Sequence, residues 1–369
     1  MERLCIKNSI ENEVMINRPL AQLFLNELIQ RNLQICIAEG GTGGHIFDQC
    51  TIPGSVRTVH MGGVFYSTAS KINLGVSAKT ISRFGEYSSE TAVEMAQLLM
   101  QKSGADCGVA TVGQLNTTVR SVDNYVCIAY VQRDRKPWVK KIILPDIGVE
   151  RRLLKTMIAQ SVFSHGLYFL KEDEKSFISD HVAIQFTEKR NKNPIIIENH
   201  VLARKILTYL QSRHCTLGTC ESCTTASISN TFTDISGASE VFHVGWMANN
   251  ERVKAMLGVS PELMKYGNVY SESVARSMAE SIRKKHHLDF VIATTGTMDT
   301  FDHRPYHSTT KPGTVYVAIA GKDITVSTKL IVPCPFGHSR EQVELTAISL
   351  ILKYVNQQVC GIISDIPTP

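Results

Sequence analysis

The feature that most constrains the fold of this chain is an internal repeat. The tetrapeptide LGVS occurs at 74–77 and again at 257–260, which is 183 residues later. At this same spacing the two halves share other identical residues, namely the pairs Lys71/Lys254, Gly62/Gly245, Ser88/Ser271, Ala92/Ala275, Met95/Met278, Asp106/Asp289 and Gly113/Gly296. So many coincidences in one register indicate that the sequence contains two related copies of one unit.

Near the start of the chain the spacing between the copies is 182, so one single-residue gap separates the two registers. The residues aligned there are Glu39 with Glu221 and Thr42 with Thr224. A repeat of this length is far longer than the unit of a solenoid and therefore predicts two homologous domains. We place them at 14–170 and 196–358, with a charged linker at 171–195 in which HVAIQFTEK (181–189) alternates enough to form a strand.

Each copy contains the same order of expected helices and strands. An amphipathic helix with apolar residues at three- and four-residue steps comes first, and apolar strands follow it. A later helix opens with serines and an early Glu, which is an N-cap signature. The expected elements are helices at 19–32 and 200–214, strands at 33–39 and 215–221, strands at 59–67 and 241–249, helices at 88–104 and 271–286, a hairpin at 313–320 and 324–333, and a final helix at 339–355. Because helices alternate with strands, each copy is predicted to be an α/β fold, a three-layer α/β/α sandwich with a mixed sheet.

Composition excludes several classes of protein. The chain is 43% hydrophobic and 20% charged, which is typical of a globular protein. Its net charge of +5 is small, and its basic clusters KRNK (189–192) and RKK (283–285) are short, so no nucleic-acid partner is expected. No apolar run reaches the ~20 residues of a membrane span, and the first residues lack a signal-peptide core. We therefore expect a cytoplasmic protein whose ten cysteines are reduced, and no zinc at the lone CxxC of Cys220 and Cys223.

An ordered series of short motifs runs through the second copy. It consists of ESCT (221–224), the segment ending in Lys254, LGVS, SESVARSMAE, TTG (294–296), KPGTVYVAIA and FGHSR (336–340). The first copy carries AEGGTGG (38–44), GGVFYSTASK (62–71), LGVS, YSSETAVEMA and GVER (148–151). Both series resemble the C-terminal domain family of the competence/damage-inducible protein CinA, the nicotinamide mononucleotide deamidases. The resemblance implies a CinA C-terminal-like fold in both copies.

The resemblance also implies a reaction and a set of roles. The family cleaves the carboxamide of nicotinamide mononucleotide to give nicotinic acid mononucleotide and ammonia. Carried over by position, Ser222 is the implied nucleophile and Lys254 its base, which requires that burial lower the lysine pKa. Thr295 is implied as a further catalytic residue near the oxyanion. The implied substrate-binding residues are Glu221, Thr224, Asn249 and Arg340, of which the arginine suits a phosphate. Hydrolysis of this kind requires no metal and no organic cofactor.

The first copy lacks part of this constellation. Gly40 stands where the family has serine, and Val112 stands where it has threonine. This copy is therefore not expected to perform serine chemistry, because it has no nucleophile. It retains Tyr66, Lys71 and Arg151 as remnants of the family's site.

Three interpretations of the function follow. The first is an amidohydrolase of the nicotinamide mononucleotide deamidase type that uses Ser222 and Lys254. The second is a catalytically inactive pseudoenzyme that binds a nucleotide-like ligand or a partner protein. A pocket filled by Trp246 or Met298 would favour the protein-interaction role. The third is a different hydrolase on the same scaffold. A variant of the first brings Tyr66 or Lys71 across the domain interface to Ser222, in one composite site.

Simpler explanations exist for several of these residues. A serine after a strand is more often a helix N-cap than a nucleophile, which applies to Ser222. The residues Asp299, Asp302, His303 and His307 lack fixed ligand spacing and are expected to form a solvated loop without metal. As partners we expect a small nucleotide-like substrate and neither nucleic acid nor membrane. The two copies could form a pseudo-dimer within the chain, and a larger homo-oligomer is left open.

Overall fold

The structure is a computed structural model, and part of the chain lies outside its description. The described residues are 18–52, 55–115, 124–144, 150–171, 193–267, 269–298, 310–333 and 340–364. The strand considered at 181–189 and the loop residues Asp299, Asp302, His303 and His307 lie outside them. Within the described ranges, no helix has both the length and the apolar character needed to cross a membrane.

The strands of both copies form one continuous ten-stranded sheet in the order β10-β9-β8-β6-β7-β2-β1-β3-β4-β5. Within each copy the first strand lies between two parallel neighbours, and two antiparallel strands extend the outer edge. The strands are β1 (Ile35–Glu39), β2 (Val59–Phe65), β3 (Cys107–Gln114), β4 (Tyr125–Gln132), β5 (Trp138–Ile143), β6 (Leu217–Glu221), β7 (Phe242–Met247), β8 (Phe290–Gly296), β9 (Thr314–Ala320) and β10 (Thr325–Ile331). The two copies therefore have the same mixed topology.

The two half-sheets are joined by antiparallel pairing of β2 with β7. Gly62 pairs with Met247, and Val64 pairs with Gly245. At the repeat spacing Gly62 corresponds to Gly245 and Val64 to Met247, so each copy offers the same surface to the other, as in a two-fold dimer interface. Because the joining strands are antiparallel, β1–β3 run in the direction opposite to β6–β8. The carboxyl ends of the two sets of strands therefore lie on opposite sides of the sheet, measured along the strand direction.

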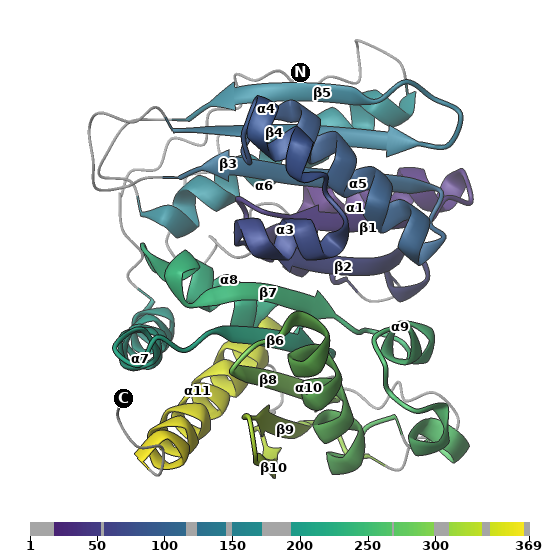
Figure 1. Ribbon diagram of the computed structural model, residues 1–369. Coiled ribbons are helices and arrows are strands. Elements are labelled where there is room, and N and C mark those ends of the chain that lie inside the picture. The colour runs from purple at the N-terminus through teal and green to yellow at the C-terminus, as the bar shows by residue number, and fades with distance from the viewer. Residues whose placement is uncertain are drawn as a thin grey trace.

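Helices cover both faces of this sheet, as Figure 1 shows. The side chains of α3, α5, α9 and α10 form the hydrophobic cluster on one face, and those of α1, α2, α6, α7, α8 and α11 form the cluster on the other. The helices are α1 (Arg18–Gln30), α2 (His45–Cys50), α3 (Thr68–Leu74), α4 (Ala78–Phe84), α5 (Ser89–Ser103), α6 (Arg151–Lys171), α7 (Pro194–Gln211), α8 (Ser227–Thr233), α9 (Glu251–Met256), α10 (Glu272–His286) and α11 (Arg340–Ser364). The predicted three-layer α/β/α class with a mixed sheet is confirmed.

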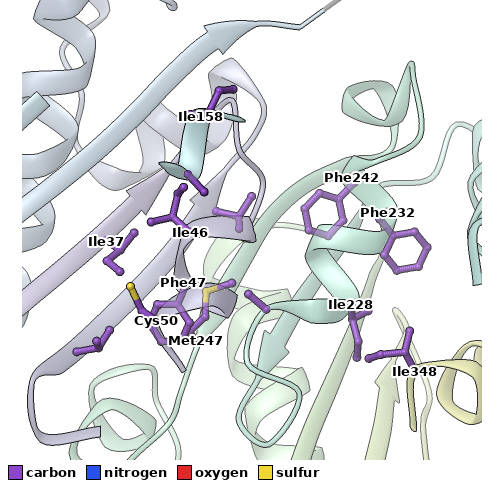
Figure 2. Packing of buried hydrophobic residues seen from close by; sticks show 14 of the residues in the cluster. Ile37, Ile46, Phe47, Cys50, Ile158, Ile228, Phe232, Phe242, Met247 and Ile348 are labelled. Atoms are coloured by element: carbon purple, nitrogen blue, oxygen red, sulfur yellow. The ribbon is translucent and has the colours of Figure 1, made fainter. Parts of the chain in front are cut away.

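The two copies also share a core where the short helices α2 and α8 meet. Figure 2 shows their buried side chains, with Phe47 of the first copy near Met247 of the second. Gly62 makes room on β2, because a Cβ there would lie 2.3 Å from the ring of Phe47. Burial of this apolar surface stabilises the join by roughly 25 cal/mol for each square ångström removed from water.

The boundaries of the elements agree closely with the sequence pattern. Ser88 and Ser271 are the N-caps of α5 and α10, and each accepts a hydrogen bond from a backbone N–H three residues on. The main differences are in two helices of the second copy, since α11 runs to Ser364 beyond the predicted end at 355, and α7 already begins at Pro194 before the predicted start at 200. Proline suits this position, because its missing N–H is not needed in the first turn of a helix.

Candidate active site

Ser222 and Lys254 meet at the carboxyl end of β6. Ser222 directly follows the strand, and its backbone N–H donates to the Thr294 carbonyl oxygen on β8 at 3.0 Å. Lys254 lies on α9, which begins after Asn250 as N-cap, and its Nζ is 3.0 Å from Ser222 Oγ and 2.9 Å from the Ala248 carbonyl oxygen. The predicted pair is therefore within hydrogen-bond distance.

Burial changes the acid–base properties of this lysine. Lys254 is only 1% exposed, and no described carboxylate forms an ion pair with it. Burial lowers the pKa of Lys254 to about 8, and the nearby thiols of Cys220 and Cys223 and the carboxylate of Glu251 only partly oppose this. A neutral amine is therefore accessible close to neutral pH, which is what a base for the Ser222 hydroxyl requires.

Glu221 is a structural residue, and the expectation that it binds substrate is wrong. It is fully buried, and each carboxylate oxygen accepts two hydrogen bonds: Oε2 from Thr224 Oγ1 and the Ile228 N–H, and Oε1 from the N–H and hydroxyl of Ser229. Glu221 thus caps α8, so the interpretation of Ser222 as the helix cap is also wrong. Burial raises the pKa of Glu221, while the bonds from Ser229 oppose that shift.

Thr224 has a structural role as well. Its hydroxyl lies 2.7 Å from that of Thr294 and donates to Glu221, and the residue is fully buried. The first copy repeats this network, with Thr42 and Thr111 hydroxyls 2.6 Å apart. The network persists in the copy that has no nucleophile. Thr224 therefore stabilises the fold, and the expectation that it contacts substrate is wrong.

Thr295 and Asn249 are both engaged in protein contacts. The Thr295 hydroxyl donates to the Val269 carbonyl oxygen at 3.0 Å, so its proton is not directed at an oxyanion. The Asn249 side chain donates to the Val59 carbonyl oxygen at 3.1 Å and thereby ties β7 to the start of β2. Both side chains thus form contacts within the protein, and the roles predicted for Thr295 in catalysis and for Asn249 in substrate binding stay predictions.

The turn that follows Ser222 has an unusual backbone. Thr225 and Ala226 have φ values of 48° and 76°, in the left-handed region that β-branched residues rarely adopt. The Thr225 hydroxyl donates to Glu344 Oε1 at 2.8 Å, which holds the turn against α11. Such strain persists only where the surroundings impose it, and it is concentrated at functional sites.

Arg340 is the first residue of α11, as Arg151 is of α6. The positive charge of Arg340 lies near the Cys223 thiol, whose pKa is raised to about 12 by burial while Lys254 and Arg340 oppose that increase. The predicted anion-binding arginine is thus close to the turn that carries Ser222. Residues 299–309 and 334–339 lie outside the described residues.

The corresponding place in the first copy differs in two ways. Gly40 replaces the nucleophile, and a Cβ there would lie 3.2 Å from Val112 Cγ1 and 3.6 Å from the Lys71 side chain. Lys71 is buried, but its Nζ forms an ion pair with Glu86 Oε2 at 2.8 Å. Val269 occupies the position of Glu86 in the second copy. The first copy therefore has neither the nucleophile nor a free base.

Tyr66 does not reach Ser222, so the hypothesis of one composite site is wrong. The Tyr66 N–H donates to the His243 carbonyl oxygen, whereas Ser222 lies beside Ala248 at the other end of β7. Five residues of strand span roughly 16 Å. Lys71 likewise remains in its own copy. Trp246 fills neither site, because it packs against Phe65 and donates to His286 Nε2 at 2.8 Å.

The first copy nevertheless contains a cavity of about 260 Å³. Tyr66, Tyr87 and Arg151 line it together with Gly40. The second copy completes its wall with Ser236, Gly237 and Ser239, which precede β7. Sequence reasoning missed both Glu86 and these wall residues. Glu86 could have been found, because its exchange for Val269 is visible at the repeat spacing.

Comparison with known proteins agrees with the repeated architecture. A sequence model of the CinA C-terminal domain matches this chain twice, over residues 17–165 and 199–359. A CinA-like protein of Pseudothermotoga lettingae is 36% identical over 164 residues, which cover 44% of this chain and 39% of the relative. A CinA-like protein of Flavobacterium psychrophilum is 29% identical over 224 residues, which cover 60% and 49%. The chain therefore spans less than half the length of either relative. The crystal structure of competence/damage inducible protein CihA from Agrobacterium tumefaciens aligns with a TM-score of 0.39 and 23% identity, over 43% of this chain and 93% of that one.

Proposed function

The chain belongs to the CinA C-terminal domain family, and on this basis we propose that its second copy is an amidohydrolase. The proposed reaction converts the carboxamide of nicotinamide mononucleotide, or of a close analogue, to the carboxylate with release of ammonia. Ser222 is the proposed nucleophile and Lys254 the proposed base. The observation that carries the proposal is the 3.0 Å contact between Lys254 Nζ and Ser222 Oγ, made by a buried lysine with a lowered pKa.

The proposed chemistry has two stages that share one base. Neutral Lys254 takes the proton from Ser222 as the serine oxygen attacks the carboxamide carbon. When the C–N bond breaks, Lys254 returns that proton to the leaving nitrogen, so ammonia departs and an ester remains on Ser222. Water then attacks the ester while Lys254 takes its proton, and the carboxylate product leaves as Ser222 regains a proton from Lys254. No further reactant is required.

Arg340 is the proposed partner of the substrate phosphate. Its guanidinium can contact two phosphate oxygens at once, and it begins the helix that packs against the Ser222 turn. Its charge is also close enough to influence the Cys223 thiol. A phosphate on Arg340 would thereby hold the other end of the substrate near Ser222.

The proposal extends to the assembly and its location. The reciprocal pairing of β2 with β7 supports a pseudo-dimer in which the two copies take the places of two subunits. The seven cysteines of the described residues that are free thiols suit a reducing compartment such as the cytoplasm.

Release of ammonia from nicotinamide mononucleotide by the purified chain tests this function. Ser222→Ala should reduce kcat by at least about a thousandfold, because the remaining groups cannot form the ester. Ser260→Ala is the matched control, since Ser260 is exposed on the segment after α9 and touches no proposed site residue. Retention of wild-type turnover by the Ser222→Ala protein would disprove the proposed mechanism.

A further inference from the structure

The first-copy cavity has the features of a binding site without those of a catalytic site. It holds about 260 Å³, slightly below the roughly 300 to 1,000 Å³ usual for small-molecule pockets, so its ligand must be small. Gly40 provides no nucleophile. Lys71 stands at the position of the base, but Glu86 forms an ion pair with it. A ligand held here would therefore not be hydrolysed.

The charge in this cavity selects an anion. Arg151 lines the wall and donates to the Tyr66 hydroxyl at 2.8 Å and to the Leu115 carbonyl oxygen. Its Nε is buried without a hydrogen-bond partner among the described residues, and none of their carboxylates forms an ion pair with it. A guanidinium in this state favours a phosphate, which can accept two of its N–H groups.

The remaining walls suit a ring. Tyr66 and Tyr87 both line the cavity, and aromatic rings offer flat apolar surface at little cost in side-chain entropy. The Tyr66 ring is itself held in place, because it meets Phe242 edge-on with centroids 6.3 Å apart. A phosphate group and one small planar ring are together the chemistry of a mononucleotide.

The site exists only where the two copies meet. Ser236, Gly237 and Ser239 from the second copy close the cavity on the side of β7. The helix that begins with Arg151 also carries Arg152 and Lys155, which bind the carboxylate of Asp234, the residue directly after α8, at 3.1 and 2.7 Å. A ligand on Arg151 would consequently contact both copies at the join.

We propose that this first-copy cavity binds a small phosphate monoester that bears a single ring, and that it retains this ligand unchanged. The cavity lies at the carboxyl ends of β1–β3, on the side of the sheet opposite to Ser222. Binding of the ligand there does not depend on hydrolysis. The cavity is thus a second ligand site, additional to the proposed active site, whose occupancy would stabilise the joined copies by mass action.

Calorimetric titration of the full-length Ser222→Ala protein with nicotinamide mononucleotide tests the proposal, because turnover is then excluded. Adding Arg151→Ala should remove one binding event, or weaken it by at least about tenfold, as expected for a lost charge-assisted contact. Arg340→Ala in the same background is the matched control, and the Arg151-dependent event should survive it. Inorganic phosphate should compete for that event.

A second variant distinguishes loss of the binding site from misfolding of the Arg151→Ala protein. Ser239 is exposed, so Ser239→Trp can obstruct the cavity from the surface without removing a buried contact. It should abolish the same event while circular dichroism remains that of the parent. If neither Arg151→Ala nor Ser239→Trp alters the binding of nicotinamide mononucleotide or phosphate, the proposal is wrong. That result would leave the amidohydrolase proposal intact, whereas Arg151-dependent binding without ammonia release would refute only the latter.

Discussion

Lys254→Met should stabilise the protein more at pH 7 than at pH 9.5, relative to the wild type. Lys254 is 1% exposed, and burial lowers its pKa from 10.5 to about 8. The native state therefore holds this proton less tightly than the unfolded chain does. The resulting loss of stability is complete below about pH 8 and disappears as pH rises towards the unfolded value of 10.5. Methionine has no proton to hold and removes this dependence.

The magnitude follows from the shift. Lowering this pKa from 10.5 to about 8 corresponds to about 3 kcal/mol at pH 7, of which about 1 kcal/mol remains at pH 9.5. The hydrogen bonds from Lys254 to Ser222 and to the Ala248 carbonyl oxygen are lost in the variant at both pH values. Their loss affects the absolute difference in stability but largely cancels when the two pH values are compared. The advantage of the methionine variant should thus shrink by about 2 kcal/mol between pH 7 and pH 9.5.

Urea denaturation of both proteins at these two pH values provides the measurement. Lys79→Met serves as the control for removing a lysine, since Lys79 is exposed on α4. Hydrolysis by the wild type should also increase with pH up to about 8 and then level off, because the neutral amine is the active form. A stability difference that does not change with pH would refute the reasoning, since Lys254 would then have no lowered pKa with which to activate Ser222.

Two predictions concern the join between the copies. Lys155→Met should lower the free energy of unfolding by about 1 to 3 kcal/mol, because the buried Asp234 loses its partner at 2.7 Å and keeps Arg152 and His200 at 3.1 Å; an unchanged free energy in urea denaturation would contradict this. Burial and the charge of Glu344 raise the pKa of Asp48 to about 6, so native stability falls as pH rises from about 4 to about 6. Asp48→Asn should therefore raise the free energy of unfolding by up to about 3 kcal/mol at pH 7.5 and by little at pH 4, and an equal effect at both pH values would disprove the assignment.

The fold was predictable because the repeat supplied each element twice. The serines at 88 and 271 identified two helix starts, and both proved to be N-caps. The join between the copies was not predictable in the same way. Pairing of β2 with β7 depends on a reciprocal register between strands 183 residues apart, and nothing local to either strand specifies its partner.

The sequence predicted the candidate site well where a role depends on the type of residue. It predicted the site less well where a role depends on the direction in which a side chain points. Ser222 and Lys254 were identified from their motifs, and they lie 3.0 Å apart. Glu221 stands beside Ser222 in sequence, but alternate residues of a strand point to opposite faces, and its carboxylate turns to cap α8. Adjacency in sequence therefore misassigned it.

The contrast between the two buried lysines is itself an argument about function. A lysine without a counter-ion in a core lowers stability, and a carboxylate nearby offsets that cost. In the first copy, where Gly40 has replaced the nucleophile, Glu86 provides that carboxylate for Lys71. The second copy has Val269 at the same position and leaves Lys254 without an ion-pair partner among the described residues. Active sites characteristically contain residues that lower the stability of the fold, because activity requires those residues. The uncompensated charge of Lys254 therefore supports the proposal that its proton affinity is used, and the compensated charge of Lys71 supports the proposal that the first copy only binds.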